Sequence, residues 1–333
     1  MSVADQAAPA GQSERTSPAG VVQRVATRGR SSAVVIIFVI LFITLSIASG
    51  PFLTKENLLN ICDEWSSTGI IAVAATLVLI AGGFDLSVAA VFSISGIVAA
   101  KLASSMGVAP ALLIGALSGL LIGAINGVIV VGVKVNSIIV TLAMGFIIDG
   151  LSTQLTGGNL ITVTNPAFSS LGNGTFLGAS IPTWCFVGTA LILGFVLHAT
   201  VYGRYLYAVG DNVEAAKLAG VRTGRTVWVA YALCGLAAGF AGVIIASQQA
   251  TGQAQSAPDL VFNVIAAVVV GGTSILGGAG AVWRTVVGVG LLALIGNGAT
   301  LLNLSQTWFE IISGVIILGA SALDVLGRRQ GSS

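Results

Sequence analysis

Residues 201–227 read VYGRYLYAVGDNVEAAKLAGVRTGRTV, and this stretch determines how the rest of the chain is interpreted. The whole chain is only 8% charged. This stretch nevertheless contains Arg204, Asp211, Glu214, Lys217, Arg222 and Arg225 between two long apolar runs. A charged segment in that position is typical of a loop that leaves a membrane on its cytoplasmic side.

The centre of this loop predicts a short helix with its own start and stop signals. Asp211 is a candidate N-cap, and Glu214 follows three residues later, at the spacing of a capping box. Gly220 is suited to end the helix in the left-handed conformation. The residues between are mostly small: Ala215, Ala216, Leu218 and Ala219. Such a helix fits docking to another protein, and the alternative is an ordinary cytoplasmic loop with some helix.

The composition predicts an all-α polytopic membrane protein. Of 333 residues, 55% are hydrophobic, and the mean hydropathy is +0.99. Apolar runs of about 20 residues can each cross a bilayer, and helices satisfy their own backbone hydrogen bonds there. The 44 glycines fit close helix packing. The three cysteines and the single histidine have no metal-site or redox spacing. The chain has no Gly-Lys dipeptide, which excludes a Walker A loop. Neither a metal site nor catalysis by this chain is therefore expected.

The apolar runs predict about ten transmembrane helices. The expected spans are residues 33–50, 62–81, 88–105, 109–131, 136–155, 182–200, 228–248, 259–271, 282–302 and 307–325. Residues 1–32 are expected to form a disordered basic cytoplasmic tail, 33–326 the membrane domain with the loop 201–227, and 327–333 a second tail. Ten spans place both termini on one side. That side is cytoplasmic, because it holds all of the 14 Lys and Arg except Lys55 and Lys101.

Two glycine-rich turns follow apolar runs, at 82–87 (GGFDLS) and 271–280 (GGTSILGGAG), and are candidates for re-entrant segments. They are a faint sign of an internal repeat. Asp85 is expected to hydrogen-bond within its own turn. The motif residues of the two turns are Gly82, Gly83, Asp85, Leu86, Ser87, Gly271, Gly272, Gly277 and Gly278.

Uncharged polar residues within the spans or at their ends suit a path for a hydroxyl-rich solute. The candidates are Asn126, Asn136, Thr141, Gln154, Asn263 and Asn297. Hydrogen bonding between helices is the alternative role for each of them. Asp149 is the one carboxylate expected deep in a span. A single acid favours a structural or path-lining role over a proton relay.

Four motifs in order resemble the ribose-type permease subunits of bacterial ABC importers, a family that also includes branched-chain amino acid permeases. The motifs are AGGFDLSVAAV (81–91), VTLAMGFIIDGLSTQLTGG (140–158), YGRYLYAVGDNVEAAKLAGV (202–221) and VVVGGTSILGGAGAVWRTVVGVGLL (268–292). Glu214, Ala215, Ala216 and Gly220 also match the EAA-x-x-x-G core of importer coupling loops. The resemblance covers residues 33–325.

The resemblance implies a multi-pass subunit of the bacterial inner membrane that forms the path for a small polar solute, a monosaccharide first of all. It implies a homodimer or pseudo-dimer, cytoplasmic ATPase subunits that carry ATP and Mg, and an extracytoplasmic solute-binding protein. The coupling helix would include Asp211, Asn212, Glu214, Ala215, Ala216, Lys217 and Gly220. The alternatives are a stand-alone secondary carrier or channel, and a membrane scaffold without transport.

Overall fold

The computed structural model describes residues 34–255, 257, 259–305, 307–312, 314, 315 and 318. The tails expected at 1–32 and 327–333, and much of the span expected at 307–325, lie outside the described residues. The helices are Val34–Ala48, α2 (Lys55–Glu64), α3 (Ser66–Ile80), α4 (Val88–Met106), α5 (Val108–Val128), α6 (Ser137–Thr156), α7 (Ser170–Asn173), α8 (Ile181–Ala199), α9 (Val201–Asp211), α10 (Val213–Leu218), α11 (Thr223–Gln249), α12 (Leu260–Val270) and α13 (Val282–Leu301).

The chain is a polytopic helical membrane protein, as predicted. Among the described residues, six helices are long and apolar enough to cross a membrane, and a seventh is added if α2 and α3 count as one bent span. These helices match the expected spans closely, although α11 starts at Thr223, inside the loop expected at 201–227. The helices at the first and eighth expected spans, Val34–Ala48 and α12, are shorter.

Two expected spans differ from simple membrane-crossing helices. The span predicted at 62–81 is divided into α2 and α3, which meet at Trp65 with a bend of 47°. The helix α12 has 11 residues, which rise about 16 Å. That length is about half of the roughly 30 Å hydrocarbon core. The short α12 agrees with the eighth expected span, 259–271, which is itself shorter than a full crossing. The bend at Trp65 was not predicted, because hydropathy detects apolar residues but not the direction of the chain.

The core is centred on α3, in which every residue except Thr68 is buried. Glycines allow the long helices around it to approach closely. A β-carbon at Gly119 of α5 would lie 2.7 Å from the Gly239 Cα of α11, too close for any side chain. Gly123 and Gly235 face each other in the same way. The glycine content therefore serves helix packing, as predicted.

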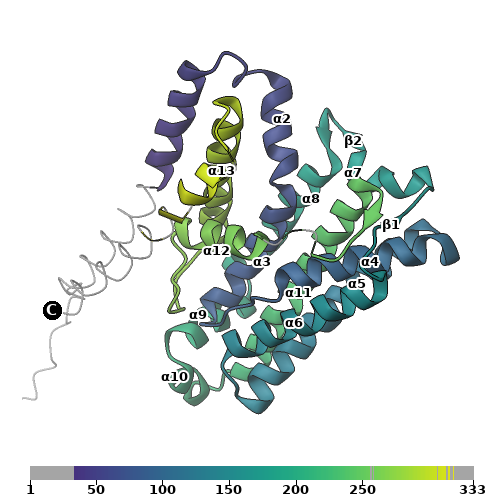
Figure 1. Cartoon of the computed structure of the whole chain (residues 1–333). Helices are drawn as coiled ribbons and strands as arrows, with labels where there is room; N and C mark the ends of the chain where they lie inside the picture. The colour runs from purple at the N-terminus through teal and green to yellow at the C-terminus, as the bar shows by residue number, and fades with distance from the viewer. Residues whose placement is uncertain are drawn as a thin grey trace, which may run out of the picture.

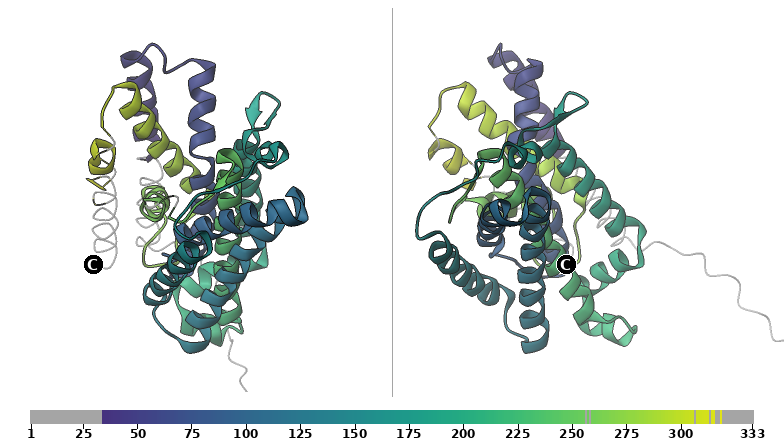
Figure 2. Two further views of the ribbon diagram at one scale, coloured as in Figure 1. Left: turned by 45° about the vertical axis from the view of Figure 1, so that its right-hand side comes forward. Right: turned by 90° about the vertical axis from the view of Figure 1, so that its right-hand side faces the viewer.

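The segment between the spans expected at 136–155 and 182–200 contains short elements. These are β1 (Ile161–Thr162), the 3-10 turn Pro166–Ser169, α7, β2 (Thr175–Phe176) and β3 (Ala179–Ser180). Strand β1 pairs antiparallel with β4 (Thr251–Gly252), which lies between the spans expected at 228–248 and 259–271. Strands β2 and β3 form a hairpin. The hairpin and α10 lie at opposite ends of the molecule in every view (Figures 1 and 2).

Candidate functional site

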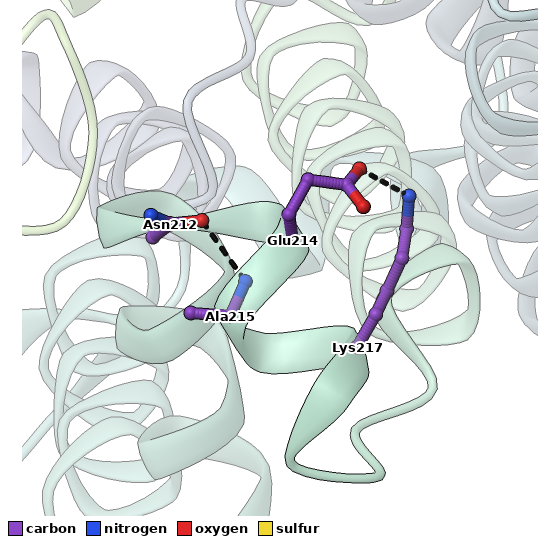
Figure 3. Close-up of polar contacts among 4 residues, drawn as sticks. All are labelled: Asn212, Glu214, Ala215 and Lys217. Carbon is purple, nitrogen blue, oxygen red and sulfur yellow. Dashed lines mark hydrogen bonds and ion pairs between the residues drawn. The ribbon is translucent and has the colours of Figure 1, made fainter.

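The loop 201–227 folds as two helices, α9 and α10, before α11 begins (Figure 1). The N-cap of α10 is Asn212, whose side chain accepts a hydrogen bond of 3.0 Å from Ala215 N (Figure 3). The prediction of Asp211 as N-cap is wrong, because α9 continues through Asp211. Glu214 consequently makes no capping box and pairs with Lys217 instead, at 2.6 Å.

The end of α10 has the predicted geometry. Gly220 has φ +82°, a conformation that favours glycine. The Gly220 amide donates to Lys217 O, and the Val221 amide donates to Ala216 O. These two bonds form a Schellman motif, which satisfies carbonyls that the helix end would leave unpaired.

The surface of α10 differs from the predicted small-residue face. Ala216 is only 4% exposed and packs into the protein. Leu218 is 91% exposed, and Ala215 and Ala219 are also exposed. Any partner that docks on α10 would therefore contact a protruding leucine with alanines beside it rather than Ala216.

The two glycine-rich turns have the same backbone geometry. Helix α3 ends with Gly82 at φ +81°, and α12 ends with Gly272 at φ +87°. In the first turn Gly82 N donates to Leu79 O and Gly83 N to Val78 O. In the second turn, the amides of Gly272 and Thr273 donate to Val269 O and Val268 O in the same pattern. Gly82 is therefore structurally equivalent to Gly272, the second glycine of the pair 271–272. An alignment of the two Gly-Gly pairs would instead match Gly82 with Gly271, so the structural match is shifted by one residue.

Asp85 is buried and hydrogen-bonds within its own turn, as predicted. Its Oδ1 atom accepts from Ser87 N at 3.0 Å and from Ser87 Oγ at 2.6 Å. Other helices hold the same turn: Asn126 Nδ2 of α5 donates to Ser87 Oγ at 2.8 Å, and Leu86 N donates to Thr141 Oγ1 of α6 at 3.0 Å. Asn126 and Thr141, proposed for the solute path, thus take part in helix–helix hydrogen bonding.

The other candidates for the solute path are dispersed. Asn136 caps α6 through a bond from Ile138 N. Asn297 of α13 exchanges amide hydrogen bonds of 2.8 and 3.2 Å with Asn57 of α2. Gln154 is exposed on α6, and Asn263 is half-buried on α12. The six residues do not gather in one place.

The end of α9 meets both glycine turns at one junction. Gly278 N donates to Ile80 O at 2.9 Å. A β-carbon at Gly210 would overlap Ile80 O and lie 2.6 Å from Gly278 N. A β-carbon at Gly277 would lie 2.9 Å from Gly82 Cα and 3.0 Å from Gly210 O. Three backbone segments therefore touch without side chains between them.

Two tyrosines fix α9 against the membrane helices. Tyr207 Oη donates to Gly280 O at 2.7 Å, and Tyr202 Oη donates to Thr226 O at 3.1 Å. Burial raises the pKa of the Tyr207 phenol, and the nearby Arg284 charge acts in the opposite direction. Both hydroxyls are thus kept as neutral donors, and their hydrogen bonds connect α9 to the segment just before α13 and to the first turn of α11.

Sequence reasoning missed Gly210 and Tyr207. Both lie within the quoted motif 202–221, but only their tertiary contacts distinguish them from their neighbours. A glycine in the last turn of a helix is a weak signal of close backbone approach, because many such glycines only end helices. Among the described residues, no three His, Cys, Asp or Glu side chains gather as a metal site.

Apolar helices around a buried core, with α9 and α10 seated on the two glycine-rich turns, fit the membrane subunit of a transporter. The chain belongs to the family described as branched-chain amino acid transport system / permease component, whose model matches residues 57–321. It is a permease subunit of an ABC importer, a multi-pass protein of the inner membrane. ATP hydrolysis takes place on a separate ATPase subunit, and importers of this family also use a solute-binding protein.

Curated relatives match over most of their length. The L-arabinose ABC transporter permease protein AraH of Azospirillum brasilense is 36% identical, over 96% of this chain and 97% of the relative. The ribose import permease protein RbsC of Bacillus subtilis is 38% identical, over 86% and 89% respectively. The L-arabinose transport system permease protein AraH of Escherichia coli is 35% identical, over 87% and 88%. No solved structure matched the chain.

Proposed function

We propose that this permease transports a monosaccharide, with a pentose as the first candidate. The support is that relatives matched over most of their length are named for L-arabinose and ribose. ATP and Mg would bind to the partner ATPase and not to this chain. A second copy of the chain, or a closely related one, would complete the path as a homodimer or pseudo-dimer.

We further propose that α10 is the coupling helix that docks on the ATPase. The observation that supports this role is the position of α10, which is exposed and capped at both ends. Helix α9 directly precedes α10 and connects it to the junction at Gly210. Asn212 and Gly220 fix the ends of the helix, while the exposed pair of Glu214 and Lys217 lies at its rim. Rim charges tune association more than they hold a complex together.

Reconstitution tests the transport proposal. Vesicles containing the permease with an ABC ATPase and a solute-binding protein from the same genome should accumulate radiolabelled L-arabinose or D-ribose only when ATP is present. Permease alone should accumulate neither sugar. Uptake by permease alone, abolished by a protonophore, would instead establish the stand-alone carrier. Absence of uptake of both pentoses by the complete system would reject the pentose assignment.

The ten-span arrangement with cytoplasmic termini stays part of the proposal and is tested by cysteine labelling. Leu218 is 91% exposed on α10, and Leu177 is 79% exposed on the β2–β3 hairpin at the opposite end. The basic residues of loop 201–227 favour a cytoplasmic position for α10. In a Cys62→Ser, Cys185→Ser background, an impermeant thiol reagent should label Leu177→Cys in intact cells and should label Leu218→Cys only after permeabilisation. Labelling of both in intact cells would contradict the orientation.

A further inference from the structure

A cavity of ≈ 320 Å³ lies between α4, α6 and the segment before α12. Its size is at the lower end of small-molecule pockets, which are about 300–1,000 Å³. Its polar lining residues include Asp149 near the middle of α6 and Gln255 before α12, and the ring of Phe146 forms another part of the wall. None of the six path candidates from the sequence lines this cavity.

The Asp149 carboxylate is available to a ligand. Among the described residues no charged group or hydrogen-bond donor pairs with this side chain, and only its backbone carbonyl is used, by Thr153 Oγ1. A carboxylate at membrane depth is costly unless it faces a polar or water-filled space. The cavity, with Ser93 and Gln255 as its other polar lining residues, gives this carboxylate room for water or a solute, so the position of Asp149 is explained if it lines a path for a polar solute.

The lining suits a sugar. A carboxylate accepts hydrogen bonds only, from one or two hydroxyls, whereas an amide such as that of Gln255 both donates and accepts. Phe146, whose side chain is 70% exposed, offers an apolar ring on which the C–H face of a sugar can lie. We propose that this cavity is a binding site on the transport path of the monosaccharide, called the station below. Asp149 and Gln255 are its hydrogen-bonding residues. This inference rests on the proposed function.

A second, larger cavity contrasts with this one. It measures ≈ 520 Å³ and lies between α8 and the start of α13. Its walls are mainly apolar, with Phe186, Leu191, Phe195 and Val286 among the lining residues. Such a lining suits acyl chains rather than a solute with many hydroxyls. The smaller cavity is therefore the better station, and it also includes Leu86 of the first glycine-rich turn.

Uptake of L-arabinose and D-ribose by the complete ATP-driven vesicle system tests this station. Asp149→Asn keeps the shape of the side chain and removes the charged acceptor, and its uptake efficiency is expected to fall about tenfold or more. Sugar-loaded binding protein should still stimulate ATP hydrolysis by the ATPase in complexes that contain the Asp149→Asn permease. Glu56→Gln, the same change on an exposed carboxylate of α2, serves as the matched control and should transport normally.

If the wild-type system takes up sugar and Asp149→Asn takes it up equally well, the station is overturned while the transport function stands. Absence of uptake by the wild type itself would reject the proposed function.

Solute protection gives a second readout. In the Cys62→Ser, Cys185→Ser background, Ala89→Cys places a thiol on the cavity wall. The transported pentose should slow its modification by a small thiol reagent several-fold, and a non-transported polyol should not. Equal rates with both would overturn the station.

Discussion

Gly210→Val is expected to lower the yield of folded permease sharply and to abolish sugar uptake. A β-carbon at this position would overlap Ile80 O and crowd Gly278 N, which are both backbone atoms. They cannot move aside as a side chain could. Overpacking of this kind typically costs about 1–3 kcal/mol, and loss of the bond from Gly278 N to Ile80 O adds about 1 kcal/mol. The expected destabilisation is therefore about 2–4 kcal/mol.

Thermal melting of the detergent-solubilised complex and uptake in vesicles measure these effects. Gly188→Ala provides the control, because Gly188 lies within α8 and has no atom within 4 Å of its β-carbon position. Gly210→Ala adds the same β-carbon without the two methyl groups of valine, so it should also lower the melting temperature and the uptake, each by less than Gly210→Val. Wild-type melting and uptake by Gly210→Val would refute the close junction.

The junction gives a physical route from α10 to the solute cavity. Helix α9 ends against the turn that follows α3, and the same turn continues to Leu86 in the cavity wall. Because the contact at Gly210 is backbone against backbone, a displacement of α9 has to move the turns rather than compress side chains. Tyr207 adds a second fixed point at Gly280. The arrangement supports α9 as the lever between the ATPase and the membrane helices.

Much of the fold could be predicted from hydropathy, since runs such as 88–105 and 136–155 match α4 and α6 within one or two residues. The short α12 was also expected, at 259–271. The bend at Trp65 could not be predicted, because composition does not report the direction of the chain. The tails and the complete tenth span remain predictions.

The candidate site was predicted less completely than the fold. Gly220 was identified correctly because a helix-ending glycine is a local signal. The N-cap was misplaced by one residue, since α9 runs without a break into the position of Asp211. Asn126 and Thr141 were proposed for the solute path, but they hold the turn around Asp85. Tertiary contacts decide the role of a polar membrane residue, and one sequence does not contain them.

The exposure pattern of α10 decides which substitution tests docking. Ala216→Trp would force an indole into the protein's own packing, because Ala216 is buried. A loss of coupling in that variant would not distinguish misfolding from failed docking. Leu218 is the better probe, since its side chain protrudes from the same helix and contributes little to the core.

Leu218→Asp is expected to leave the permease folded and inserted while it prevents stable association with the ATPase. If Leu218 enters an apolar pocket of the partner, the change removes its buried area and places a charge in a desolvated position. A hot-spot residue at the centre of an interface costs about 2–4 kcal/mol when altered, or about 30- to 1,000-fold in affinity, and the buried charge of Leu218→Asp is expected to reach that range. Leu177→Asp makes the same change on the hairpin at the opposite end, and should leave association unchanged. Co-purification of the ATPase with each variant, together with uptake in the same membranes, decides the matter. Full co-purification and uptake by Leu218→Asp would remove α10 as the docking element.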